Sequence, residues 1–154
     1  MSKTKKKLCL ISSSGGHFEQ LKMLTKLEDK YNIYVVTEKT NYNENCDYTL
    51  FPGNCNKFKS AISLFLNMFL SLFLILKEKP DVIISTGTMV AFPTILWAKL
   101  LGKKVIYIET FACVKCGTNC ARFIYKHHLY DLFIYQWENL RNEYPDGVYG
   151  GGIY

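Results

Sequence analysis

Short, almost continuous apolar runs alternate with segments of helical periodicity along the whole chain. In residues 17–29, for example, apolar residues recur at every third position from Phe18 to Leu27. Strands are expected at residues 7–12, 31–37, 48–51, 81–85, 104–108, 131–135 and 147–149, and helices at 17–29, 57–79, 90–101, 121–130 and 137–143. Apolar strands that alternate with helices indicate a parallel sheet covered on both faces. The expected fold is therefore α/β, with a Rossmann-like, doubly wound parallel sheet.

The length and the charge of the chain limit its organisation and its partners. The 154 residues fit a single domain, 1–154, without room for a second core. A hydrophobic fraction of 49% excludes disordered, collagen-like and coiled-coil chains. The net charge of +6 favours a membrane surface, phosphates or nucleic acid. Nucleic acid fits least well, because the lysines are divided between the N-terminus and the flanks of the helix expected at 57–79.

Three expected strands end in residues suited to an anion or sugar site. After the first strand, Ser13, Ser14, Gly15 and Gly16 lead into His17 at the start of a helix. Glycines allow close backbone approach, and His17 is placed to bind a phosphate or to take a proton from a hydroxyl. The alternative is a tight turn in which His17 only caps the helix. The turn matches neither the dinucleotide fingerprint nor a P-loop.

The other two turns follow later strands. Thr86, Gly87 and Thr88 follow the strand expected at 81–85, and Glu109 ends the strand expected at 104–108. Because ligands of open α/β sheets bind at the carboxyl ends of the strands, all three turns are candidates for one site.

The helix expected at about 57–79 contains an unusually apolar stretch. Residues 61–76 include only Ser63, Asn67 and Ser71 as polar residues, spaced four apart on one narrow face. Sixteen residues span about 24 Å, short of the roughly 30 Å hydrocarbon core of a bilayer. Lysines flank the stretch, as in a helix lying on an anionic interface, so Phe65, Phe69 and Phe73 are expected to associate with a membrane. A core helix and a true membrane span are the alternatives.

The cysteines are expected to be reduced and free of metal. The lysine-rich start is followed by only four apolar residues, too few for an export signal, so disulfides are not expected. Cys113, Cys116 and Cys120 form a C-x2-C-x3-C pattern that only the adjacent His127 and His128 would complete as a zinc site. Adjacent histidines on a helix point in different directions, so no metal is predicted.

Six stretches, in this order, resemble a known group of proteins: residues 11–17, 36–40, 79–87, 102–109, 131–134 with 136–138, and 148–151. The chain resembles the acceptor-side half of GT-B glycosyltransferases related to MurG. It resembles more closely the PssD/Cps-type polysaccharide biosynthesis proteins. These are similar to the membrane-anchoring subunit of the eukaryotic two-subunit N-acetylglucosaminyltransferase of lipid-linked oligosaccharide synthesis. The resemblance implies one half of a GT-B glycosyltransferase.

The resemblance further implies a split enzyme that is inactive without its second subunit. This chain would bind a polyprenyl-diphosphate-linked saccharide at the cytoplasmic face of the membrane, as a peripheral or monotopic protein. A donor-binding subunit would hold the nucleotide sugar, so no cofactor is expected here. His17 would be the base or a phosphate ligand, and Glu109 would orient the acceptor.

The C-terminus is expected to leave the sheet and dock on the second subunit through Tyr149, Gly150, Gly151 and Tyr154. Two positions depart from the family pattern. Cys113 stands where an arginine often follows Phe-Ala, and Gly152 stands where a proline is usual. Because Cys113 replaces that arginine, position 113 lacks a cation that could contact a phosphate.

Two other interpretations are compatible with the sequence. One is a non-catalytic scaffold that recruits and activates a partner glycosyltransferase. The other is a nucleotide-binding α/β protein working alone, which is disfavoured because the fingerprint acid after the second strand is missing. Replacement of His17 distinguishes a scaffold, which would tolerate it, from a shared active site.

Overall fold

The computed structural model describes residues 5–41, 45–53 and 56–153. In this part of the chain, seven strands form one sheet in the order β3-β2-β1-β4-β5-β6-β7, and all neighbouring strands are parallel. The strands are β1 (Lys7–Ile11), β2 (Asn32–Glu38), β3 (Tyr48–Leu50), β4 (Val82–Ser85), β5 (Lys104–Ile108), β6 (Leu132–Tyr135) and β7 (Val148–Tyr149). This strand order is that of a doubly wound Rossmann-like sheet, and the predicted fold class is confirmed.

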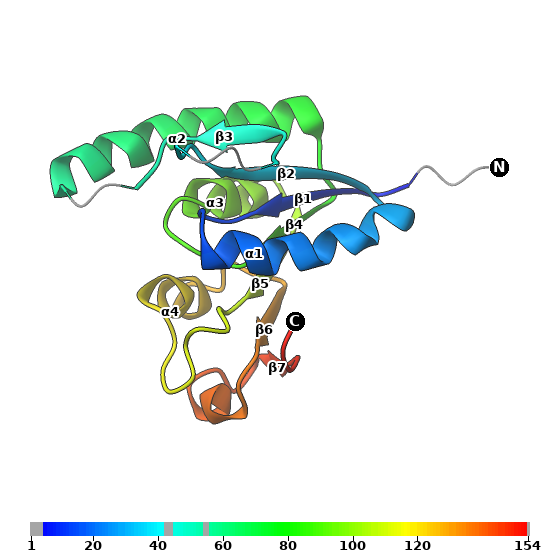
Figure 1. The fold of residues 1–154 in the computed structure, drawn as a ribbon, viewed down its shortest axis with the longest axis vertical. Coiled ribbons are helices and arrows are strands. Elements are labelled where there is room, and N and C mark those ends of the chain that lie inside the picture. Colours follow the sequence, from blue (N-terminus) through cyan, green and yellow to red (C-terminus); the bar gives the residue numbers. More distant parts are fainter. Residues whose placement is uncertain (1–4, 42–44, 54–55, 154) are drawn as a thin grey trace.

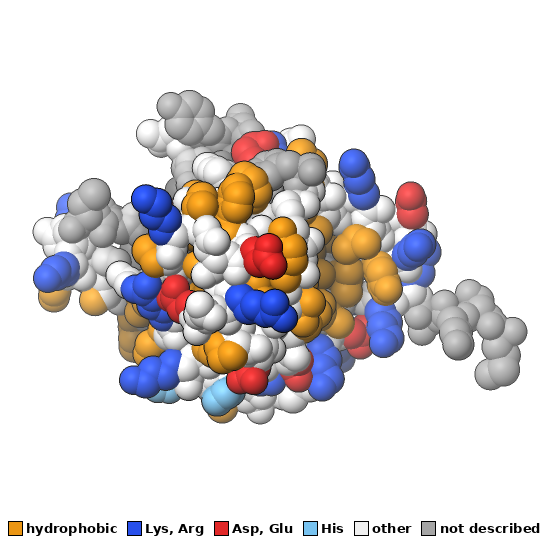
Figure 2. Space-filling view, turned by 90° about the horizontal axis from the view of Figure 1, so that it is seen from below, with side chains coloured by type: hydrophobic (Ala, Val, Ile, Leu, Met, Phe, Trp, Pro, Cys, Tyr) orange, Lys and Arg blue, Asp and Glu red, His pale blue; other side chains and the backbone are white. Residues whose placement is uncertain are grey.

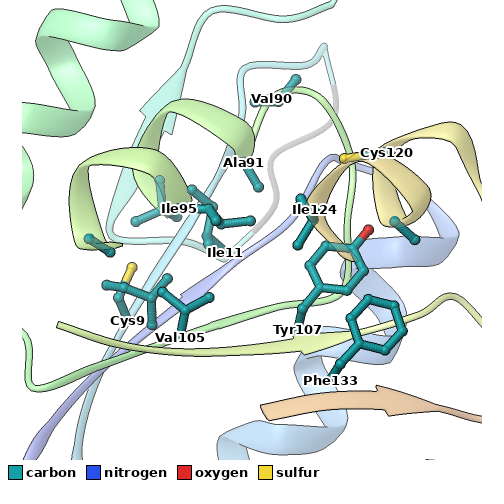
Figure 3. Close-up of a cluster of buried hydrophobic side chains, with 14 of the residues drawn as sticks. Cys9, Ile11, Val90, Ala91, Ile95, Val105, Tyr107, Cys120, Ile124 and Phe133 are labelled. Atoms are coloured by element: carbon teal, nitrogen blue, oxygen red, sulfur yellow. The ribbon is translucent and has the colours of Figure 1, made fainter. Parts of the chain in front are cut away.

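The helices cover both faces of the sheet, and α2 runs along its β3 side (Figure 1). They are α1 (Gly16–Lys22), α2 (Lys57–Glu78), α3 (Phe92–Leu100) and α4 (Asn119–Lys126), with the 3-10 helices η1 (Met23–Asp29) and η2 (Glu138–Asn142). Phe18 and Leu21 of α1 pack with Leu10 on one face. Residues of α2, α3 and α4 pack on the other face, where Ile95 lies over Ile11 and Ile124 lies near Tyr107 (Figure 3).

The helices predicted at 90–101 and 137–143 are slightly shorter, and the second of them is a 3-10 helix; two other helices differ more from their predicted extents. The helix predicted at 17–29 changes to a 3-10 helix at Met23, and no residue of that second part is buried. The helix predicted at 121–130 begins at Asn119, because the Thr118 hydroxyl caps it by accepting from the Ala121 N–H at 3.1 Å. It ends at Lys126, since His128 adopts a left-handed conformation with φ of 50°.

An aspartate immediately precedes three of the strands and fixes their register in the same way. The aspartate N–H donates to a backbone carbonyl of the neighbouring strand, and the N–H of that same neighbouring residue donates to the aspartate carboxylate. The pairs are Asp47 with Val35, Asp81 with Lys7, and Asp131 with Val105, at carboxylate oxygen to nitrogen distances of 2.7, 2.8 and 2.9 Å. These contacts satisfy backbone groups beside the amino ends of β3, β4 and β6.

Candidate functional site

The loops after β1 and β4 meet at the carboxyl edge of the sheet. These two strands are neighbours, although their helices α1 and α3 lie on opposite faces, so the chain reverses its winding direction between them. The Ser13 N–H donates to the Gly87 carbonyl oxygen at 3.3 Å, which joins the two loops directly. The structure therefore brings together the predicted residues of the first two turns. Such a reversal point is where open α/β sheets bind ligands.

His17 is held by Thr86 through two hydrogen bonds. Nδ1 of His17 lies 2.7 Å from the Thr86 carbonyl oxygen, and the Thr86 hydroxyl donates to the His17 carbonyl oxygen at 2.9 Å. A carbonyl oxygen only accepts, so Nδ1 carries the proton in this contact. In the neutral ring, Nε2 then has a lone pair that accepts a hydrogen bond or a proton. His17 is half-buried, while Gly15 and Gly16 beside it are exposed.

Gly87 lies beside the His17 ring in a conformation that favours glycine. Its φ is +98°, and a Cβ at this position would lie 3.2 Å from the Tyr107 hydroxyl oxygen and 3.5 Å from the imidazole of His17. A side chain here would therefore crowd the Tyr107 hydroxyl, contact the imidazole and strain the backbone. Thr86 and Gly87 are buried, and Thr88 is half-buried at the rim of the loop.

An acidic residue does end the second strand, contrary to the expectation from the sequence. β2 extends to Glu38, whose carboxylate accepts from the Ser14 N–H at 3.1 Å, the Ser14 hydroxyl at 2.9 Å and the Gly53 N–H at 3.0 Å. The sequence pattern predicts that this strand ends at Thr37, with Glu38 in the following loop, whereas the structure includes Glu38 in the strand. Glu38 joins the first glycine-rich turn to the loop after β3, so its oxygens are already occupied by protein donors.

Glu109 lies in the interior, and its side chain is not exposed to solvent. The carboxylate accepts from the Thr110 N–H at 2.8 Å, the Thr118 N–H at 3.0 Å, the Thr118 hydroxyl at 3.1 Å and the Tyr144 hydroxyl at 3.0 Å. Burial and the negative charge of Glu109 both raise the pKa of Tyr144, which keeps the phenol protonated as a donor. The structure thus directs this carboxylate to the protein's own loops.

On helix α2, Asn67 and Ser71 face the protein together with Leu74 and Ile75, whereas most of the large apolar side chains face outward. Asn67 and Ser71 are buried: the Asn67 amide bonds both the N–H and the carbonyl of Phe51, at 2.8 and 2.9 Å. The large apolar side chains of the outward face are between 39% and 75% exposed: Phe58, Ile62, Phe65, Leu66, Phe69, Phe73 and Leu76. An ordinary surface helix has the opposite arrangement. The most apolar 18-residue window of α2 is only 17% buried, and by length and composition the helix could cross a membrane.

The cysteine-bearing loop contains free thiols. Cys113 is half-buried, Cys116 is exposed, and Cys120 is buried at the start of α4. Burial raises the pKa of the Cys120 thiol to about 11. Among the described residues, no group of three or more His, Cys, Asp or Glu side chains is arranged to hold a metal ion.

The C-terminal segment folds back onto its own domain, whereas the sequence suggested that it leaves the sheet. After β7, the Gly150 N–H donates to the Tyr135 carbonyl at 2.9 Å. Ile153 packs against the buried cluster that contains Leu10, Phe18 and Leu21. Gly151 has φ of +66°, which allows this turn. Tyr149 is 53% exposed, whereas Tyr154 lies outside the described residues. Figure 2 views the molecule from the end that carries β7 and shows hydrophobic side chains interspersed with Lys, Arg, Asp and Glu.

Two buried amides near the site were missed by the sequence analysis. Gln20 lies on α1 one turn after His17, and Gln136 directly follows β6; each is 2% exposed. A glutamine on a helix ordinarily points to solvent. One signal was available: position 20 lies between Phe18 and Leu21 on a helix that packs against the sheet.

Comparison with known proteins was made for sequence and for structure. A family model described as "Oligosaccharide biosynthesis protein Alg14 like" matches residues 54–153. The UDP-N-acetylglucosamine transferase subunit ALG14 of Mus musculus is 28% identical over 181 residues, which covers 96% of this chain and 82% of the mouse protein.

Two solved structures have a similar fold. MurG from Acinetobacter baumannii has a TM-score of 0.68 at 14% identity, over 88% of this chain and 42% of that chain. UDP-GlcNAc 2-epimerase from Methanocaldococcus jannaschii also has a TM-score of 0.68, at 18% identity, over 91% of this chain and 42% of that chain. The chain thus spans less than half of each of these two structures. The predicted fold, one half of a GT-B glycosyltransferase, is confirmed. The chain belongs to the Alg14-like family of oligosaccharide biosynthesis proteins.

Proposed function

We propose that this chain is the acceptor-binding, membrane-associated subunit of a split glycosyltransferase. A partner subunit would hold the nucleotide-sugar donor, and the acceptor would be a polyprenyl-diphosphate-linked saccharide. The mouse relative is named a subunit of a UDP-N-acetylglucosamine transferase, which supports UDP-N-acetylglucosamine as the donor. The observation that carries the proposal is the clamped His17 at the reversal point of a GT-B half.

The proposed chemistry needs a base at the acceptor hydroxyl. Nε2 of His17 takes the hydroxyl proton while the acceptor oxygen bonds to the anomeric carbon of the donor sugar. The bond from that carbon to the nucleotide diphosphate breaks, and the diphosphate leaves with the electron pair. The Thr86 contact presents Nε2 in the required tautomer. Glu109 acts indirectly, as a positioning residue for the loop at Thr118.

The other candidate residues surround His17 and would bind the acceptor diphosphate. The exposed turn at Gly15 and Gly16 offers a close approach to the backbone, and Thr88 is half-buried in the loop after β4. Ser13 and Ser14 support this turn, through the Gly87 carbonyl and the Glu38 carboxylate respectively.

The outward face of α2 supports a monotopic attachment to the cytoplasmic face of the membrane. Phe65, Phe69 and Phe73 are each at least 60% exposed, and the flanking Lys57, Lys59, Lys77 and Lys79 are exposed as well. Apolar side chains enter the acyl region of such an interface, while lysines contact anionic headgroups. This arrangement would bring the acceptor lipid and the loops at His17 to the same surface.

The partner subunit would dock beside β7, at Tyr149 and the turn of Gly150 and Gly151. Tyr149 offers exposed aromatic surface of the kind that is enriched at interfaces. Val148, 50% exposed, extends this apolar surface.

The proposal is tested by purifying the tagged chain from membranes of its native host. We expect a donor-binding subunit to co-purify and the complex to transfer sugar from radiolabelled UDP-N-acetylglucosamine to a synthetic polyprenyl-diphosphate saccharide. The chain alone should transfer none. Transfer by the chain alone would refute the split enzyme, and full activity of a His17→Ala complex would identify a scaffold.

A further inference from the structure

The buried amides of Gln20 and Gln136 join four segments of the chain beneath the candidate site. The Gln136 Nε2 group donates to the Gln20 amide oxygen at 3.2 Å and to the Glu109 carbonyl oxygen at 2.9 Å. The Gln20 oxygen also accepts from the Phe111 N–H at 3.3 Å. The Gln136 oxygen accepts from the Ile153 N–H at 3.0 Å. Helix α1, the loop after β5, the end of β6 and the C-terminal segment therefore share one network.

Backbone partners fix the orientation of both amides. The Phe111 N–H requires an acceptor, so the oxygen of Gln20 faces it, and the Glu109 carbonyl requires a donor, so the nitrogen of Gln136 faces it. Rotation of either amide by 180° would place like groups against each other. In an interior position, each such mismatch costs about 1–3 kcal/mol, which favours a single arrangement.

The network holds the helix that carries His17. On one side, the His17 ring is bonded to the Thr86 carbonyl, and one turn further along α1, Gln20 is bonded to Gln136. The helix has only seven residues, so movement at Gln20 displaces His17 as well. The N–H of Ile153, near the chain end, is bonded to the other side of the Gln136 amide.

We propose that Gln20 and Gln136 are positioning residues that transmit the placement of the C-terminal segment to His17. This inference rests on the proposed function, in which His17 is the base and the partner subunit docks beside this segment. A partner that moves the segment at Ile153 changes the bond to Gln136, and through Gln20 it changes the position of the imidazole. Docking of the donor subunit thereby aligns the base with the acceptor.

The first test removes a single hydrogen bond at the chain end and observes His17 by NMR. Ile153→Pro deletes the N–H donor to Gln136 and keeps an apolar side chain, while the matched control Ile153→Ala keeps the N–H. The chain has 3 histidines, so His17→Ala assigns the ring signals. We expect Ile153→Pro and Gln136→Met to shift the His17 ring signals and to leave those of His127 and His128 unchanged. Ile153→Ala should shift none of them.

The second test measures catalysis by the complex. Gln136→Met and Gln20→Met should each lower kcat roughly tenfold with little change in the KM for the donor, since misplacement of a catalytic group by a fraction of an ångström has effects of this order. The double variant should be no worse than either single variant, because both break the same connection.

Either of two NMR results would overturn the inference: unchanged His17 signals in folded Ile153→Pro protein, or shifts of the same size with Ile153→Ala. Additive losses of kcat in the double variant would also contradict it. If the Gln136→Met protein does not fold, the Ile153→Pro protein alone tests the inference. Ile153 is only half-buried, so this substitution disturbs the interior less than a change at the buried Gln136. The NMR result needs no sugar transfer, so it stays informative if the proposed function fails.

Discussion

The hydroxyl of Thr94 on α3 donates to the hydroxyl oxygen of Ser71 on α2 at 2.8 Å, and both side chains are buried. Together with Asn67 and Phe51, this pair holds α2 to the protein through polar contacts. Leu74 and Ile75 add apolar contacts on the same inward side, whereas the outward phenylalanines are at least 60% exposed. The polar contacts that hold α2 and the residues that we propose to bind a membrane therefore lie on opposite sides of one helix, and we expect that they can be changed separately.

Replacing the inward amide of α2 should destabilise the protein even though the new residue is apolar. Asn67→Leu leaves the N–H and carbonyl of Phe51 without their partner, and we expect a loss of about 2–4 kcal/mol in the free energy of unfolding. The control Phe65→Ser, on the outward face, should change it by less than about 0.5 kcal/mol. Urea denaturation measures both. Equal stability of Asn67→Leu and wild type would contradict this orientation of α2.

Replacing the outward phenylalanines should abolish membrane binding without unfolding the protein. The triple variant Phe65→Ser, Phe69→Ser and Phe73→Ser should lose at least about tenfold in affinity for anionic liposomes in a sedimentation assay, since each ring contributes on the order of 1 kcal/mol or more. Wild-type binding should weaken as salt rises, because the flanking lysines contact the headgroups.

The control for this experiment is Leu100→Ser with Leu101→Ser, two exposed apolar residues at the end of α3. This pair should bind liposomes like the wild type. Equal binding of the triple variant and the wild type would show that α2 is not the membrane-binding element.

Most of the fold could be predicted because local sequence patterns coincide with the tertiary structure. Apolar strands alternate with helices, and the parallel arrangement follows from that alternation. The same rule brought the turns at His17 and Thr86 together, because parallel strands end at one edge of the sheet.

The direction of individual polar side chains could not be predicted in the same way. The environment of Glu109 depends on Tyr144, which is 35 residues away in sequence. The environment of Gln20 depends on Gln136, at a separation of 116 residues. No local pattern contains these pairs, and an acid or an amide at the end of an element is ordinarily exposed.

Loss of the His17 side chain should impair chemistry and leave assembly intact. His17→Ala should reduce sugar transfer by the complex by roughly a hundredfold or more, as expected for a general base. Thr86→Val removes the hydroxyl donor to the His17 carbonyl and should also lower kcat, whereas the control Thr86→Ser keeps it. Co-purification of the partner should be unchanged in all three variants. Similar kcat values for Thr86→Val and Thr86→Ser would show that the hydrogen bond from the Thr86 hydroxyl to the His17 carbonyl does not position His17 for catalysis.

Asp131 should make stability dependent on pH in the acidic range. Partial burial opposes ionisation, but hydrogen bonds from the Val105 N–H and the side chains of Lys104 and Lys99 lower the pKa of Asp131 to about 2. Its folded pKa lies below its ordinary value of about 3.9, so its contribution is complete above that value and is lost as the pH falls towards 2.

The variant Asp131→Asn should cost about 1–2 kcal/mol at pH 7, after allowance for solvent screening, and the deficit should shrink below pH 4. Urea denaturation at pH 7, 5 and 3 measures this change. Asp29→Asn, at an exposed carboxylate, is the control. A deficit that stays constant down to pH 3 and below would show that the charge of Asp131 does not contribute.

The cysteines should differ strongly in reactivity. Burial raises the pKa of Cys9 to about 12 and that of Cys120 to about 11. Both should react with iodoacetamide at pH 8 at least about a hundredfold more slowly than the exposed Cys116, because only the thiolate reacts. Peptide mass spectrometry gives the order of modification. Stoichiometric zinc that protects Cys113, Cys116 and Cys120, and is lost in Cys113→Ser, would instead establish a metal site.

The contacts of Asp81 with Lys7 and of Asp131 with Val105 lie towards the amino edge of the sheet, opposite the edge that carries His17. This separation gives an engineer two independent regions to modify. Residues around the aspartates are open to changes that raise heat resistance, without the usual conflict between a rigid scaffold and a mobile binding loop. Loops at the opposite edge are open to changes in acceptor preference, because the alignment of the strands does not depend on them.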